Sequence, residues 1–305
     1  MERGDAFQGH RPKRHRLEFR IFLTISFLVS LLPRKVMVKT GRWFGGVGYR
    51  LWHTRRRVAL GNIEHAFGPK KTHREKIRIA RESFKNTGAS VVELGWGVRR
   101  MNEAVFRRVV DVTGLDLIRE ALSRNRGAVI LPAHYGNWEI MANAVGYLNI
   151  NAHFVAKRLK NAYLDKVIND YRCETGNRVI HTNGASKKMA SVLKNGGVIA
   201  TLLDQKVPVH EGGILVDFFG RKAATTPLLA ELHLETNAPL ILARCYPLKR
   251  GRCKLVFGPE IVFQPSGNRR KDIHDLTQAC MAAIEAYIRE DPQYWIWGHK
   301  RWKLD

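Results

Sequence analysis

A histidine and a glutamate form the pair of residues in this sequence best suited to acid–base chemistry at one site. His134 and Glu139 bracket the run His-Tyr-Gly-Asn-Trp-Glu, which follows the apolar segment 128–131 and Pro132. If that segment is a strand and a helix begins near Asn137, both side chains point into one crevice at the end of the strand. Glu139 would accept a hydrogen bond from one imidazole nitrogen, so the other nitrogen is free to take a proton from a hydroxyl.

The chemistry that such a base would serve is direct transfer of an acyl group to a hydroxyl. The activated oxygen would attack a thioester carbonyl without a covalent enzyme intermediate. The sequence has no Gly-x-Ser-x-Gly elbow and no evident Cys/His pair, which is consistent with direct transfer. The alternative is a structural His134 that caps the helix. A His-x4-Glu spacing by itself is expected by chance in a chain with twelve histidines, so the strand–turn–helix setting carries the prediction.

Metal and cofactor chemistry is not indicated by the sequence. There is no His-Glu-x-x-His motif, the histidines are scattered, and no Gly-x4-Gly-Lys-Ser/Thr phosphate loop occurs. We therefore expect no metal and no cofactor. The four cysteines form no Cys-x-x-Cys pair, and we expect them to be reduced thiols. Cys245 and Cys253 could face each other across a hairpin that turns near residues 249–251.

The elements that must position the site follow an alternating rhythm. After Val110, short apolar runs at 128–131, 153–156, 178–180, 198–203, 239–244 and 254–257 alternate with segments of helical length at 137–148, 162–174, 185–194 and 226–236. This rhythm predicts an α/β fold with a largely parallel central sheet flanked by helices. A last helix is expected over about 272–290, and the capping box Thr72-x-x-Glu75 predicts a helix that runs to about Trp96.

The N-terminal segment is predicted to be a membrane anchor. Residues 21–32 carry no charge and are flanked by basic residues, but a dozen residues make only about 18 Å of helix. A cleaved signal peptide, a full span and a half-inserted helix compete. We favour an uncleaved anchor over about 17–38, half-inserted or barely spanning. The expected domains are a basic N-terminus with its anchor helix at 1–35 and a single catalytic domain at 36–305.

The charge of the chain indicates a polyanionic partner. Lys and Arg number 52 against 27 Asp and Glu, a formal net charge of +25. Residues 34–63 hold eight Lys or Arg and no acid, interleaved with Trp43, Phe44, Tyr49 and Trp52. This composition suits an anionic cytoplasmic leaflet, although a basic helix packed on the core is an alternative. A nucleic-acid arm is the weaker choice because no nucleic-acid-binding module appears, and we expect no specific nucleic acid partner.

Several further motifs accompany the His-Tyr-Gly-Asn-Trp-Glu run in a fixed order. They lie at 161–165, 171–172, 176–180, 197–205, 217–221, 224–226, 236–239 and 292–303. Together they resemble the late acyltransferases of lipid A biosynthesis, the lauroyl/myristoyl acyltransferases, within the glycerolipid acyltransferase superfamily. The resemblance covers almost the whole chain, including the N-terminal anchor.

This resemblance implies a reaction and its partners. The family's catalytic pair maps to His134 and Glu139, the donor would be an acyl carrier protein or coenzyme A thioester, and the acceptor a lipid A precursor. The enzyme would work at the cytoplasmic face of the bacterial inner membrane. A mannosylated phosphatidylinositol or another glycolipid is the alternative acceptor. Asp204 and Gln205 would line the same crevice and hold substrate, although Asp204 could instead cap a turn.

Other residues are assigned to substrate with alternatives open. Asn137 is counted among the substrate-binding residues. Lys157 and Arg158 stand where the family usually has Arg-Pro, and either could bind a phosphate, Lys as a point charge rather than a bidentate fork. Phe218 and Phe219 could line an acyl pocket or belong to the core. The C-terminal Trp295, Trp297 and Trp302 suit either a lipid or phosphate surface or a packed tail.

Overall fold

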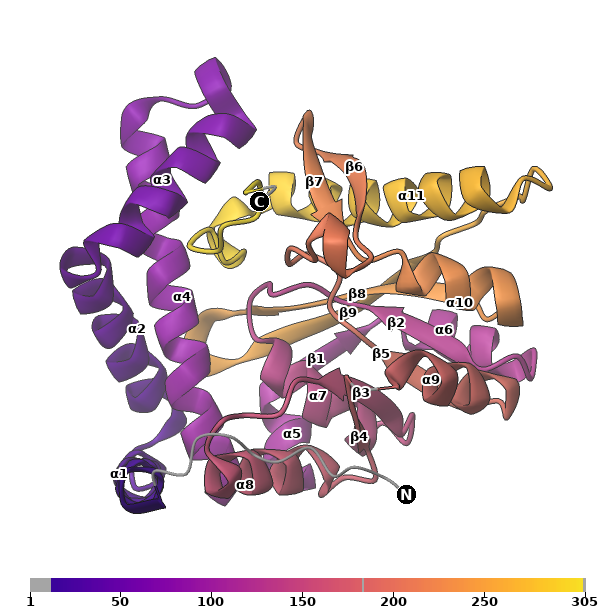
Figure 1. Ribbon diagram of the computed structural model, residues 1–305. Helices are drawn as coiled ribbons and strands as arrows, with labels where there is room; N and C mark the ends of the chain where they lie inside the picture. Colours follow the sequence, from indigo (N-terminus) through magenta and orange to yellow (C-terminus); the bar gives the residue numbers. More distant parts are fainter. Residues whose placement is uncertain (1–11, 183, 304–305) are drawn as a thin grey trace.

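A seven-stranded, mostly parallel sheet runs through the centre of the protein (Figure 1). The computed structural model describes residues 12–182 and 184–303. The strand order is β1-β9-β8-β2-β5-β3-β4, and every neighbouring pair is parallel except β8 with β9. The α/β prediction is confirmed in this respect. The strands are β1 (Val110–Thr113), β2 (Ala128–Leu131), β3 (Ala152–Ala156), β4 (Arg178–His181), β5 (Val198–Ala200), β8 (Leu240–Pro247) and β9 (Cys253–Glu260).

Helices cover both faces of the sheet, which explains why its central strands are apolar throughout. Because successive side chains of a strand point to opposite faces, Val129 and Leu131 of β2 join one core cluster, and Ala128 and Ile130 join the other. The first cluster includes residues of α9 (Ala185–Lys194), α10 (Leu228–Thr236) and α11 (Arg269–Glu290). The second includes residues of α5 (Glu103–Val109), α6 (Leu115–Ser123) and α7 (Trp138–Tyr147).

Four N-terminal helices stand along one side of the sheet (Figure 1). They are α1 (Pro12–Ser30), α2 (Arg34–Leu51), α3 (His53–Phe67) and α4 (His73–Arg100), with a short 3-10 turn, η1 (Gly68–Lys70), before α4. The Thr72 capping box starts α4 as predicted. Helices α2 and α4 approach closely because Gly45 and Gly88 face each other's backbone, where a Cβ atom would overlap the opposite helix.

Helix α1 buries Ser26 and Ser30 together with Val29, and it leaves several apolar side chains exposed. Ser26 is buried, and its hydroxyl donates to the carbonyl of Gly95 on α4 at 2.5 Å. At helical spacing on the outside, Leu17, Ile21, Ile25 and Leu28 are each at least half exposed. Across residues 12–182 and 184–303, no helix combines the length and the apolar content needed to cross a bilayer.

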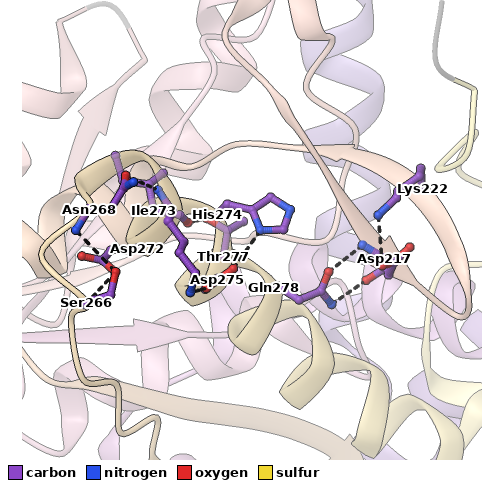
Figure 2. Close-up of polar contacts among 11 residues, drawn as sticks. Asp217, Lys222, Ser266, Asn268, Asp272, Ile273, His274, Asp275, Thr277 and Gln278 are labelled. Atoms are coloured by element: carbon purple, nitrogen blue, oxygen red, sulfur yellow. Dashed lines mark hydrogen bonds and ion pairs between the residues drawn. The ribbon is translucent and has the colours of Figure 1, made fainter.

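A two-stranded hairpin that the sequence did not predict packs on α11. It consists of β6 (Ile214–Phe218) and β7 (Arg221–Thr225), joined by Phe219 and Gly220, both at positive φ. Figure 2 shows how α11 completes the edge of β6. The Gln278 amide accepts from the backbone N–H of Asp217 at 2.7 Å and donates to its carbonyl at 3.0 Å.

The hairpin also settles where the paired phenylalanines lie. Phe218 and Phe219 are buried in an aromatic cluster with the three C-terminal tryptophans, so the core and packed-tail alternatives hold for these side chains. The tail follows η4 (Pro292–Tyr294). The hairpin of β8 and β9 turns at η3 (Lys249–Gly251) as expected, and all four cysteines are free. Cys245 lies opposite Leu255, and Cys253 opposite Pro247.

Candidate active site

The site lies where two neighbouring parallel strands end. His134 follows β2 and Asp204 follows β5, and these strands pair in parallel with Ile130 opposite Ala200. Their carboxyl ends therefore meet at one edge of the sheet. The backbone N–H of His134 donates to Oδ2 of Asp204 at 3.0 Å, and Nδ1 of the imidazole lies 2.9 Å from Oδ1.

These contacts fix the orientation of the imidazole. Because a carboxylate only accepts, Nδ1 carries the proton and Nε2 is the acceptor. Trp295 donates its indole N–H to Asp204 at 2.7 Å, which holds the carboxylate in place. The amide nitrogen of the exposed Gln205 lies 3.1 Å from Nε2 of His134. The His134 side chain is 18% exposed, against 2% for Asp204, so the acceptor nitrogen is on the open side.

The pKa of His134 is raised above its ordinary value. Burial alone would lower it, but the negative charge of Asp204 and its hydrogen bond outweigh burial, and Glu139 adds a smaller contribution. The pKa of Asp204 is lowered. Burial opposes this shift, whereas the charge and hydrogen bonds of His134 and the bond from Trp295 drive it. The imidazole of His134 therefore binds a second proton more readily than a free histidine does.

Glu139 does not take the role at Nδ1 that the sequence suggested. It forms a two-point ion pair with Arg172 of α8 (Ala162–Cys173), with N–O distances of 2.6 and 3.1 Å. Its position explains the difference, because α7 begins at Trp138 and places Glu139 in a first turn that packs near α8. Asp204, from the neighbouring strand, occupies Nδ1 instead. Glu139 acts on His134 through its charge.

Residues of β8 and α4 hold the turn that carries His134. Gly136 has a φ of +58°, and a Cβ atom there would overlap the carbonyl of Cys245. Ser90 of α4 donates to the carbonyl of Gly136 at 2.9 Å. Asn137 caps α7 by accepting from the N–H of Ile140 at 3.0 Å and donates its amide N–H to Glu93. Asn137 is 3% exposed with its amide bound to protein, so it shapes the turn instead of facing substrate as expected.

The remaining predicted residues lie further out. Lys157 and Arg158 follow β3, one strand beyond β5 at the same edge of the sheet, and both are exposed. Behind Gln205, the ring nitrogen Nε2 of His299 accepts from the N–H of Lys206 at 3.2 Å. Burial is the main cause that lowers the pKa of His299 to about 4, so this second histidine is neutral. Within the described ranges, no three His, Cys, Asp or Glu side chains are grouped as metal ligands would be.

Sequence reasoning missed Trp295 and Arg172 as parts of the site. Trp295 lies 91 residues after Asp204, and Arg172 lies 33 residues after Glu139. The available signal was their place in the motifs at 171–172 and 292–303, which carry the family resemblance. Which of those residues meet at the site depends on how distant segments pack, and the sequence does not reveal that.

Comparisons with known proteins place these features in a family. The model of the bacterial lipid A biosynthesis acyltransferases matches residues 8–304. A lipid A biosynthesis lauroyltransferase of Escherichia coli is 24% identical over 92% of this chain and 89% of its own length. A lipid A biosynthesis palmitoleoyltransferase of the same species is 23% identical over the same shares. A phosphatidylinositol mannoside acyltransferase of Mycobacterium tuberculosis is 28% identical over 67% of this chain, a match that spans 64% of that relative.

Proposed function

We propose that this chain, which belongs to the bacterial lipid A biosynthesis acyltransferase family and is therefore an O-acyltransferase, moves a fatty acyl chain from a thioester donor to a hydroxyl of a lipid A precursor. The observation that carries the mechanism is the imidazole of His134, held at Nδ1 by Asp204 with Nε2 turned to the open side. An acyl carrier protein or coenzyme A would carry the thioester. The formal charge of +25 favours the acidic carrier protein as a partner.

His134 acts as the general base in this proposal. Nε2 takes the proton from the acceptor hydroxyl as its oxygen forms a bond to the thioester carbonyl carbon. Collapse of the tetrahedral intermediate breaks the carbon–sulfur bond, and the imidazolium returns the proton to the leaving thiolate. The charge of Asp204 stabilises the imidazolium between these two steps, as does the more distant charge of Glu139.

Gln205 must yield when the acceptor arrives. Its amide lies within hydrogen-bond distance of the nitrogen that takes the proton, so the acceptor hydroxyl and the amide compete for one position. Gln205 is exposed and lies in the loop after β5, which leaves it free to turn and bind the acceptor. Glu139 and Arg172 tie α7 to α8 through their ion pair. Lys157 and Arg158, at the outer part of the same edge, are proposed to bind phosphate groups of donor or acceptor.

The N-terminal helices are proposed to rest on the cytoplasmic face of the bacterial inner membrane. The outward surface of α1 carries the apolar Leu17, Ile21, Ile25 and Leu28 beside the exposed Arg20 and Thr24, and the exposed side chains of Leu31 and Val36 follow it along the chain. Lys35 and Lys39 are exposed beside it, as suits an anionic leaflet. Residues about 17–38 would insert partway into one leaflet as the anchor, with residues 1–35 as the anchoring domain and residues 36–305 as the catalytic domain.

A second acceptor has support from one comparison. The relative that acts on phosphatidylinositol mannosides has the higher identity, although over a shorter part of the chain. In that case the same base and donor would serve a mannosylated phosphatidylinositol or another glycolipid. Only the acceptor differs between the two proposals, so acceptor analysis separates them.

The test uses the full chain in detergent with acyl carrier protein thioesters, acyl coenzyme A, a tetraacylated lipid A precursor and a phosphatidylinositol mannoside. Mass spectrometry of the lipids should find one acyl mass added by wild type. His134→Ala should lose this product by about 10²-fold or more, and Glu139→Gln should lose less. Transfer that survives in a folded His134→Ala variant would refute the base. Transfer to the mannoside alone would replace the lipid A acceptor.

A further inference from the structure

A buried ion pair connects the N-terminal helices to the catalytic turn. Arg34, the first residue of α2, pairs with Glu93 of α4, and their side chains are 8% and 5% exposed. Arg34 also donates to the carbonyl of Gly251 in η3 at 2.6 Å and approaches the sulfur of Cys253. One arginine thus joins α2, α4 and the turn between β8 and β9.

The second oxygen of Glu93 continues the connection to the site. It accepts from the amide of Asn137, whose own oxygen caps the first turn of α7. The backbone N–H of Asn137 donates to the carbonyl of Cys245 on β8 at 2.8 Å. Glu93 and β8 therefore both hold Asn137. Arg34 contacts Glu93 directly, and it contacts η3 and β9, which follow β8 in the hairpin. His134 lies three residues before Asn137 in the same turn.

Stability alone does not account for these charges. Removing two charges from water costs several kcal/mol per ion, and apolar side chains of similar volume often serve as well as a buried pair. The pKa of the Glu93 carboxyl is raised, because burial outweighs the opposing effects of Arg34 and Asn137, so its charged form depends on keeping both partners. A cavity of about 30 Å³ lined by Arg34, Glu93 and Asn137 leaves room for a water molecule beside the pair.

We propose that Arg34 and Glu93 are positioning residues for the reaction, which hold the His134 turn in its productive geometry through Asn137. The proposal rests on the acyl transfer assigned to this site. The start of α2, next to the apolar outer surface of α1, would therefore help to hold the catalytic base in position. Displacement of a base by about 1 Å can cost on the order of 10²-fold in rate.

The test compares two paired substitutions in the full chain. Arg34→Met together with Glu93→Met removes both charges and leaves no unpaired ion, so the thermal midpoint should fall only by the contribution of the hydrogen bond that Asn137 loses. Its kcat should fall about tenfold to 10²-fold, with the KM of donor and acceptor within about twofold. The control is Arg42→Met with Glu82→Met, which removes another ion pair between α2 and α4; its hydrogen bonds run to Asn86 and Lys85 on α4 and not to Glu93 or Asn137. Its kcat should stay within about twofold of wild type.

Hydrogen–deuterium exchange gives a readout that does not depend on activity. The peptide covering residues 134–141 should exchange faster in the Arg34/Glu93 variant and as in wild type in the control. Wild-type kcat or unchanged exchange in the Arg34/Glu93 variant would overturn the proposal, because the pair would then serve the fold alone. If wild type transfers no acyl group to any glycolipid, the assigned reaction fails and the exchange rates still decide the connection.

Discussion

At the catalytic turn charged and polar side chains lie inside the protein, whereas along α1 apolar side chains lie outside it. Asp204 is buried but receives three hydrogen bonds, two from His134 and one from Trp295. Ile21 and Leu28 of α1 are half exposed, while Ser26 of the same helix is buried against Gly95. Both regions depart from the usual distribution of residue types.

The difference lies in what compensates each departure. The cost of burying Asp204 is offset within the chain, because each contact is supplied by another residue of the same molecule. The outward apolar side chains of α1 are not covered in this way by the described residues, and the proposed lipid surface would cover them. Replacing a single hydrogen-bonding atom should disturb the catalytic turn. The outer face of α1 should respond only when its apolar side chains are replaced by charged ones.

The largest effect is expected from Asp204→Asn, which keeps the shape and removes the charge. An amide can donate to Nδ1, which favours the wrong tautomer, so kcat should fall roughly 10²- to 10⁴-fold.

The same substitution should also change the pH dependence. Asp204 raises the pKa of His134, so its loss lowers that pKa. A general base works when deprotonated. The acid limb of kcat/KM should therefore lie above about pH 6.5 in wild type and move to lower pH in the variant. Initial rates between pH 5 and 9 measure both, and an unmoved limb would contradict the assignment.

Vesicle binding should respond next most strongly, to charges placed on the outer face of α1. Ile21→Glu with Leu28→Glu should weaken sedimentation with anionic vesicles at least about tenfold, since each apolar side chain contributes about 1.5–3 kcal/mol when fully buried. Val262→Glu is the matched control, because Val262 is 81% exposed in the loop after β9. Equal binding by the two variants and wild type would remove the membrane role of α1.

A smaller change in rate should follow Trp295→Phe. The substitution keeps an aromatic ring in the cluster but removes the N–H that donates to Asp204. A hydrogen bond to a charged group contributes about 1.5–3 kcal/mol, part of which a water molecule can replace, so we expect a loss of about tenfold in kcat. The same assay as for Asp204→Asn measures it. A loss as large as that of Asp204→Asn would mean that the indole does more than hold the carboxylate.

The smallest effect is expected from Ser26→Ala on the inner face of α1. It removes the hydroxyl that donates to Gly95, so the free energy of unfolding should fall by about 0.5–1.5 kcal/mol. Urea denaturation measures the loss, and binding to vesicles should not change. Weaker vesicle binding by Ser26→Ala would show that the two faces of α1 do not act separately.

Much of the fold could be predicted because it depends on neighbouring residues. The bounds of β2 and α9 were those of the predicted segments, and the Thr72 box marked the start of α4. Apolar periodicity and capping act within a few residues, so the sequence carries them directly. The β6–β7 hairpin was missed because its order depends on packing against Gln278 of α11.

The sequence by itself determined that His134 stands in a turn between a strand and a helix, with Glu139 in the first turn of that helix. Only the tertiary structure decided which carboxylate meets the imidazole. Asp204 lies 70 residues away and arrives there because β5 pairs with β2, while Glu139 is taken by Arg172. Strand order and helix packing are set by the burial of whole faces, and no short stretch of sequence contains that information.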